Sequence, residues 1–175
     1  MAMDPPADLH VRFKRHPDGS ASLTGTRRDG SVTWQRQHGP SALVFPPHDL
    51  THYAVETVLG FRGGFYGLLA DGWEISDFAA PWPRGPIPEE ALVAELIVGF
   101  FDVERRHGAP LTVEAFHAQA AQHIALRRAV GKKIPTHLPA LTDDELDRVR
   151  ACRAELLAQW TAVPAGGALD LRFVR

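Results

Sequence analysis

Short segments near the N-terminus alternate apolar and polar residues, which is the period-2 pattern of half-buried strands. The alternation is clearest over residues 9–14, and it returns over residues 21–26 and 31–35. Pro17-Asp18-Gly19 and Arg28-Asp29-Gly30 separate these segments and have the composition of tight turns. The pattern therefore predicts an antiparallel meander at the start of the chain.

The end of the chain repeats this alternation. Leu169, Leu171 and Phe173 are separated by polar residues and follow the turn-forming Ala165-Gly166-Gly167. We expect this last strand to pair with the N-terminal meander and so to tie the two ends of the chain together. Residues 1–7 should form a loose lead-in.

Helical spacing of apolar residues dominates the middle of the chain. It predicts helices over residues 49–59, 88–107, 112–130 and 142–163, and a short helix that ends at Ala70. Thr142 with Glu145 has the capping-box pattern of a helix start. We expect residues 41–45 to be extended and the double proline that follows, Pro46-Pro47, to stop the strand and set the helix start. The proline-rich stretch 71–88 should be irregular.

These elements predict an α+β fold, in which a small antiparallel sheet from both termini packs against four or five helices. At 175 residues the chain fits a single domain over 1–175. Within it, residues 1–45 form the meander and connection, 46–163 the helical part, and 164–175 the final strand.

Composition excludes several classes of protein. A hydrophobic content of 45%, with 23% charged residues, is typical of a globular domain, and the net charge of −2 argues against a nucleic-acid partner. The single cysteine, Cys152, excludes an internal disulfide and a cysteine-rich zinc cluster. No apolar run approaches the roughly 18 residues of a membrane span. We expect a soluble, cytoplasmic protein, and the preference for arginine over lysine favours a bacterial source.

Ionisable side chains concentrate directly after the double proline. His48 and His52 are spaced i, i+4, so on a helix they lie on one face and can share a divalent metal ion, zinc or another. Asp49 takes the place of the glutamate in the zincin pattern H-E-x-x-H, where a carboxylate acts as catalytic base. Glu56 and Glu74 are the candidate further ligands, although Glu56 lies about 12 Å along the helix from His48.

The same residues also fit a purely structural role. Asp49 would then stabilise the helix N-terminus, and His52 would form local hydrogen bonds on a half-buried face. A second candidate surface is the aromatic segment 59–82, in which Phe65, Tyr66 and Trp73 are the candidate binding residues. Such an aromatic-rich loop either covers the core or lines a cleft.

Residues 47–56 (PHDLTHYAVE), followed by Gly64-Phe65-Tyr66-Gly67 and Ala70-Asp71-Gly72, resemble a pattern in small bacterial proteins. The resemblance covers residues 40–75. It implies no activity and no catalytic residues, only that this helix and the glycine-aromatic segment form one unit.

Two functions remain from the sequence. The favoured one is a non-enzymatic binding or interaction module, in which segment 59–82 contacts a partner or a second copy in a homo-oligomer. The alternative is a divalent-metal-binding protein, including a metal-dependent hydrolase, with its site on His48, Asp49 and His52. No nucleic acid and no membrane is expected as a partner in either case. No serine lies in a G-x-S-x-G elbow, and no glycine-rich phosphate loop follows a strand.

Overall fold

An antiparallel sheet joins the two ends of the chain. The computed structural model describes residues 8–131 and 133–175, so the expected lead-in over residues 1–7 lies outside the described residues. The strands of the described part are β1 (Leu9–Arg15), β2 (Ala21–Arg27), β3 (Val32–Gln37) and β4 (Ala168–Phe173). Their order in the sheet is β3-β2-β1-β4. The predicted meander and its pairing with the C-terminal strand are confirmed.

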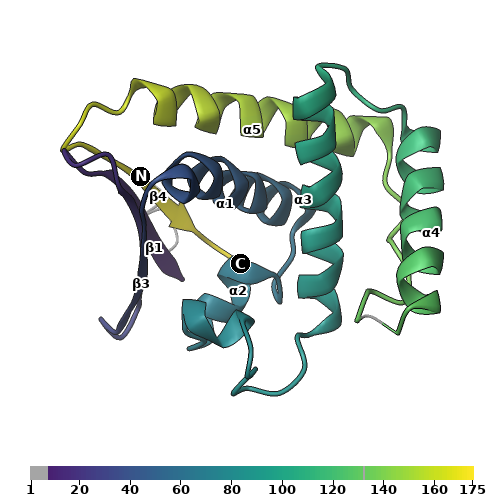
Figure 1. Cartoon of the computed structure of the whole chain (residues 1–175), viewed down its shortest axis with the longest axis horizontal. Coiled ribbons are helices and arrows are strands. Elements are labelled where there is room, and N and C mark those ends of the chain that lie inside the picture. Colours follow the sequence, from purple (N-terminus) through teal and green to yellow (C-terminus); the bar gives the residue numbers. More distant parts are fainter. Residues whose placement is uncertain (1–7, 132) are drawn as a thin grey trace, which may run out of the picture.

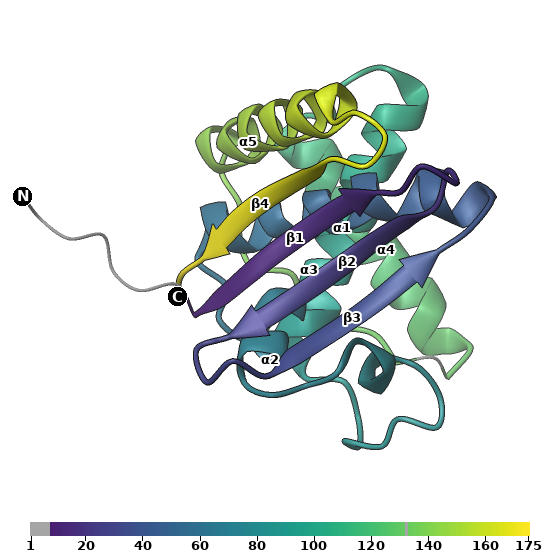
Figure 2. The same cartoon turned by 90° about the vertical axis from the view of Figure 1, so that its left-hand side faces the viewer.

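Strand β1 lies at the centre because both of its edges are paired. Val11 stands opposite Gly25 on β2 and opposite Leu171 on β4. Leu9, Val11 and Phe13 are buried on one face, as the alternation predicts. The helices cover this face only, and the other face of the sheet is left open (Figure 2).

The helices form layers behind the sheet (Figure 1). Their bounds are α1 (Pro40–Leu59), α2 (Phe65–Ala70), α3 (Glu89–His107), α4 (Val113–Ala129) and α5 (Asp143–Ala162), with a 3-10 turn η1 (Ile75–Phe78). Helix α1 lies against the sheet, and α5 runs along α1. Helix α3 crosses the end of α1, and α4 lies on the far side of α3. The α+β prediction is confirmed. Thr142 and Glu145 form the predicted capping box of α5.

Helix α1 begins at Pro40, so the prediction of an extended segment over residues 41–45 is wrong. Pro40 takes the first helical turn, where its missing N–H has no partner to lose. Pro46 and Pro47 lie inside the helix. The two hydrogen bonds that they cannot donate would have gone to the carbonyls of Ala42 and Leu43, close to the start of the helix. As a result the residues after the prolines are regular helix.

The described part of the chain contains no helix that combines the length and the apolar character of a membrane span.

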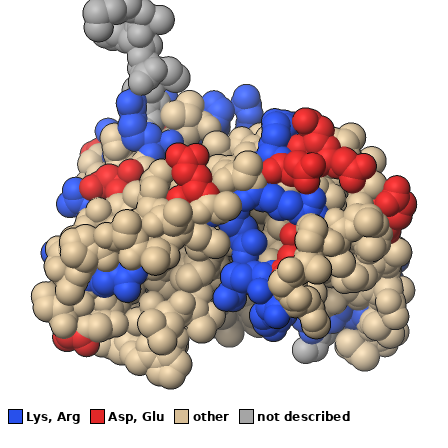
Figure 3. All heavy atoms as spheres, turned by 90° about the horizontal axis from the view of Figure 1, so that it is seen from above, with Lys and Arg blue, Asp and Glu red and all other residues tan. Residues whose placement is uncertain are grey.

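The face that α5 crosses carries charges of both signs, and Lys and Arg side chains gather around a hollow there (Figure 3).

Candidate functional site

Two histidines of α1 and one glutamate of α3 converge on one point. His48 and His52 lie one turn apart on α1, with their ring centroids 5.0 Å apart. The Oε2 atom of Glu95 is 2.9 Å from Nε2 of His52 and 3.7 Å from Nε2 of His48. One ligand atom from each of the three residues lies within 4.8 Å of the other two. Among the described residues, no other group of histidine, cysteine or acidic side chains converges in this way.

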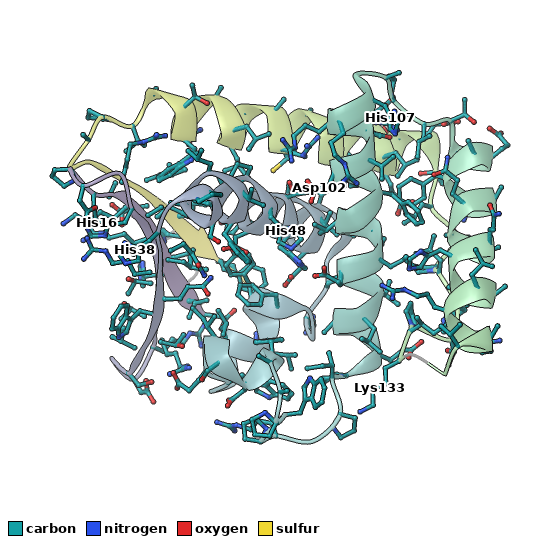
Figure 4. All side chains as sticks on the ribbon, viewed as in Figure 1. His16, His38, His48, Asp102, His107 and Lys133 are labelled. Atoms are coloured by element: carbon teal, nitrogen blue, oxygen red, sulfur yellow. The ribbon has the colours of Figure 1, made fainter. Side chains whose placement is uncertain are left out.

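The other nitrogen of each imidazole is held by a carboxylate. His48 Nδ1 donates to Asp102 Oδ2 at 3.0 Å, and His52 Nδ1 donates to Glu56 Oε1 at 3.4 Å. In Figure 4 the side chains of His48 on α1 and Asp102 on α3 point toward one another. A proton on Nδ1 leaves the Nε2 lone pair free for a ligand, and an imidazole held by a carboxylate in this way is typical of metal-binding histidine. With Nδ1 of each ring held in this way, both Nε2 atoms are directed at Glu95.

The spacing of these atoms suits a small cation. Tetrahedral ligands at about 2.0–2.1 Å from zinc stand roughly 3.3 Å from one another. The two distances from Glu95, 2.9 Å and 3.7 Å, lie on either side of that value. Glu95 is 62% exposed while His52 is only 6% exposed, so the carboxylate can adjust around a fixed imidazole.

A cavity of about 410 Å³ opens beside the three residues. Apolar side chains from several elements form most of its wall: Phe45, Phe65, Ile75, Phe78, Ile87 and Leu92. Its polar lining consists of Gln35, His48, Asp49, His52 and Glu95. A largely apolar pocket with a few converging polar groups is the usual form of a small-molecule site.

The metal-free cluster is a network of charged hydrogen bonds. Burial works against a charge on His48, but hydrogen bonds to Asp102 and Glu95 outweigh it and raise its pKa to about 10. Burial likewise opposes a charge on His52, and hydrogen bonds to Glu56 and Glu95 raise its pKa to about 9. The same two imidazoles lower the pKa of Glu95. Without a metal ion, the protonated imidazoles of His48 and His52 bind the ionised Glu95 carboxylate.

Asp49 lies in the cavity wall and is buried. Burial raises its pKa to about 7, although the neighbouring His52 and His48 act in the opposite direction. Its side chain has one long contact, 3.5 Å from Nε2 of Gln35. The backbone carbonyl of Asp49 accepts a hydrogen bond from the Tyr66 hydroxyl at 2.9 Å. Helix α1 therefore places the Asp49 carboxylate in the cavity wall, and among the described residues Gln35 is its one side-chain hydrogen-bond partner.

Helix α5 also reaches this cluster. Arg153 Nε donates to Thr51 Oγ1 at 3.1 Å. The Nη2 atom of Arg153 and the Oδ1 atom of Asp102 are both buried, and neither has a hydrogen-bond partner among the described residues. Burial opposes ionisation of Asp102, but the hydrogen bond from His48 and the charges of His48, Arg105 and Arg153 lower its pKa.

The structure gives the two predicted glutamate ligands other contacts. Glu56 is buried, and its two oxygens accept hydrogen bonds from the backbone N–H groups of Phe65 and Tyr66 at 2.8 and 2.9 Å. It therefore connects His52 to the start of α2. Glu74 forms an ion pair with Arg27 at 3.1 Å and is not part of the cavity wall.

The three aromatic candidates separate in the structure. Phe65 lines the cavity, and its ring centroid lies 5.7 Å from that of His52. Tyr66 is fully buried in the core. Trp73 packs against Phe78, with ring centroids 5.3 Å apart. Only Phe65 of the three faces the cavity.

The sequence reasoning missed Glu95 and Asp102. Both lie on α3, one of the most apolar helices, and they are seven residues apart, which places them on one face two turns from each other. Glu95 stands alone among Leu92, Val93, Ala94 and Leu96. An acidic residue on the inner side of an otherwise apolar run is the signal that could have identified them. The remaining labelled histidines, His16, His38 and His107, lie away from His48 (Figure 4).

Comparison with known proteins adds no relative: no family model, no curated protein and no solved structure matches the chain.

Proposed function

We propose that this protein binds one divalent metal ion through His48, His52 and Glu95 and uses it for hydrolysis in the adjoining cavity. The observation that carries the proposal is the convergence of the two Nε2 atoms on Oε2 of Glu95, at 3.7 and 2.9 Å. Imidazole and carboxylate together suit Zn²⁺, Mn²⁺ and Fe²⁺.

Three protein ligands leave coordination positions for water and substrate, which distinguishes a catalytic site from a closed structural one. A divalent ion lowers the pKa of bound water, so that hydroxide forms near neutral pH. The cavity of about 410 Å³ beside the ligands has room for a small substrate. Asp49 is the carboxylate on the same wall, and we assign it the role of proton acceptor for the attacking water.

Asp102 and Glu56 are positioning residues in this proposal. Each holds the Nδ1–H group of one histidine, at 3.0 and 3.4 Å, and so keeps the Nε2 atom directed at the ion. Glu56 has a second task, because its oxygens also bind the first N–H groups of α2. The site is therefore tied to the same helix junction that places Phe65 in the cavity.

The interaction-module hypothesis has less support from these positions. Tyr66 is fully buried, so it offers no surface to a partner. Phe65 and Trp73 pack against neighbouring rings. A metal centre, in contrast, accounts for the convergence of two histidines on Glu95 and for the carboxylates of Asp102 and Glu56 behind them.

Metal reconstitution tests the proposal. Chelator-treated protein is incubated separately with Zn²⁺, Mn²⁺ and Fe²⁺ under anaerobic conditions, desalted and analysed for bound metal. We expect about one equivalent in the wild type, a loss in His52→Ala and Glu95→Gln, and no change in Glu155→Gln, whose carboxylate is exposed on α5. Wild-type protein that takes up none of the three ions would refute the metal site.

A second step tests the chemistry. The loaded protein is screened against nitrophenyl esters and phosphate esters, and Asp49→Asn is compared with the wild type. We expect Asp49→Asn to keep its metal and lose at least 100-fold in turnover, since general-base catalysis contributes about 10²–10⁴-fold. Equal turnover in the two proteins would remove Asp49 from the mechanism.

A further inference from the structure

A second groove runs along the other side of α3, between this helix and α4. Its volume is about 340 Å³, and Leu92 and Glu95 line both this groove and the cavity of the metal site. The Glu95 carboxylate therefore lies at the junction of the two hollows. Glu95, one of the proposed ligands, therefore borders the groove as well as the cavity.

The lining of the groove is strongly basic. Arg106, Arg127 and Lys133 contribute three cations, and Glu95 at the junction is the single carboxylate among the lining residues. Among the described residues, the Arg106 side chain has no hydrogen-bond or ion-pair partner. Arg127 Nε contacts His123 Nε2 at 3.4 Å, and Lys133 Nζ lies 5.9 Å from the Trp82 ring. No carboxylate in the described part of the chain forms an ion pair with any of these three cations.

A glycine forms part of the floor of the groove. Gly99 lies in the middle of α3, one turn after Glu95, where glycine costs a helix roughly 0.5–1 kcal/mol relative to alanine. No close packing explains it: among the described residues, no atom lies within 4 Å of the position that a Cβ would take. The glycine therefore leaves open space in the groove at this point of the helix.

We propose that this groove is a substrate-binding subsite beside the metal centre and that it holds a phosphate monoester group of the substrate, while the bond that is hydrolysed lies in the cavity on the Asp49 side. The three cations exceed the one carboxylate by two charges, and a phosphate monoester carries about −1.5 to −2 at pH 7. Arginine side chains match phosphate oxygens with paired N–H donors. The apolar floor, with Leu96 and Phe100, would accommodate the organic part of the ligand. This assignment rests on the proposed function for the reaction, but the groove itself can be tested without metal.

Titration calorimetry with inorganic phosphate on chelator-treated protein is the test. We expect the double variant Arg106→Ala/Arg127→Ala to bind phosphate at least 10-fold more weakly than the wild type. Arg148→Ala is the matched control, because this arginine is exposed on α5 and pairs with Asp144, and its affinity should stay within twofold. Acetate, a monoanion, should bind at least 10-fold more weakly than phosphate.

Gly99→Leu tests the position of the ligand. Its side chain has room to extend into the groove, so we expect unchanged thermal stability and loss of phosphate binding. His52→Ala should lose metal and still bind phosphate, which separates this inference from the proposed function. Phosphate binding that survives Gly99→Leu, disappears in His52→Ala, or is absent from the wild type would overturn the inference.

Discussion

Helix α3 carries two carboxylates that have opposite surroundings. Glu104 is buried, and Arg150 of α5 binds both of its oxygens, at 2.7 Å to Oε1 and 3.2 Å to Oε2. The backbone N–H of Leu111 adds a third hydrogen bond at 2.9 Å. Glu95 is largely exposed, and its partners among the described residues are the two imidazoles of His48 and His52. The donors around Glu104, an arginine and a backbone N–H, keep their protons. The donors around Glu95 are imidazoles, which can lose theirs.

This difference separates a structural ion pair from a candidate site. An arginine stays charged at all physiological pH values, so Glu104 can only join α3 to α5 and to the chain that follows α3. A histidine can exchange its proton for a metal ion, so the partners of Glu95 can become ligands. The nature of the donor, rather than the presence of a carboxylate, therefore decides which cluster has chemistry to perform.

Removing Glu104 should have the largest effect on stability. In Glu104→Ala the Arg150 guanidinium, 22% exposed, loses its buried partner and keeps only Asp147 and the Leu111 carbonyl. The Leu111 N–H loses its acceptor as well. Breaking such a pair costs about 3–5 kcal/mol, and the partial exposure places this one near the lower end. Chemical denaturation of metal-free protein measures the change in free energy of unfolding. Metal affinity at the other cluster should stay within twofold. A large drop in metal affinity with intact folding would contradict the separation of the two clusters.

Removing the Glu95 carboxylate should reverse this pattern. Because Glu95 is 62% exposed, we expect Glu95→Gln to change the free energy of unfolding by less than about 1 kcal/mol. Metal affinity should fall by more than about 100-fold, beyond the usual loss for a residue that only orients a ligand. Competition with a chelating dye measures this affinity. Unchanged affinity would show that the carboxylate is not a ligand.

The pH dependence of metal affinity sharpens the same contrast. Hydrogen bonds to carboxylates raise the pKa of His48 to about 10 and of His52 to about 9 in the metal-free protein, against the opposing effect of burial. Both imidazoles must lose a proton to bind metal, so affinity should rise with pH, by up to about 100-fold per unit between pH 6 and pH 9. Calorimetry in buffers of different ionisation enthalpy would count the protons released. Affinity that is flat over this range would mean that the histidines are not ligands.

The smallest effect is expected at Asp102. Asp102→Asn keeps the size of the side chain and weakens its hold on His48 Nδ1, now at 3.0 Å. We expect metal affinity to fall by about 10–100-fold, which is typical of a carboxylate behind a metal-bound histidine. The exposed Asp144, which pairs with Arg148, gives a control in Asp144→Asn. A loss of the same size in the control would exclude a specific role for Asp102.

Local signals were sufficient for most of the fold. The strands follow from alternation, and Thr112 and Thr142 mark helix starts because each side-chain oxygen binds an N–H one turn ahead. The start of α1 was missed because the double proline was taken as the end of an extended segment, whereas here the helix continues through both prolines. Pro46 and Pro47 lie in the N-terminal half of α1, close to its start at Pro40.

The candidate site was only half predictable. His48 and His52 are local, since a separation of four residues brings them together on any helix. Glu95 is 43 residues from His52, and its place opposite the pair depends on how α3 crosses α1. Periodicity gives the inner face of a helix but not its rotation against a neighbour. Glu56 and Glu74 were nearer in sequence, yet the backbone of α2 and Arg27 already occupy their oxygens.

Anomalous diffraction from crystals of metal-loaded protein tests the central claim most directly. Data collected on both sides of the zinc or manganese absorption edge would locate the ion independently of any assay. We predict one strong peak between α1 and α3, about 2.0–2.2 Å from Nε2 of His48, Nε2 of His52 and Oε2 of Glu95. An ion bound elsewhere, or loaded crystals in which His52 still contacts Glu95 directly with no ion between them, would contradict the account.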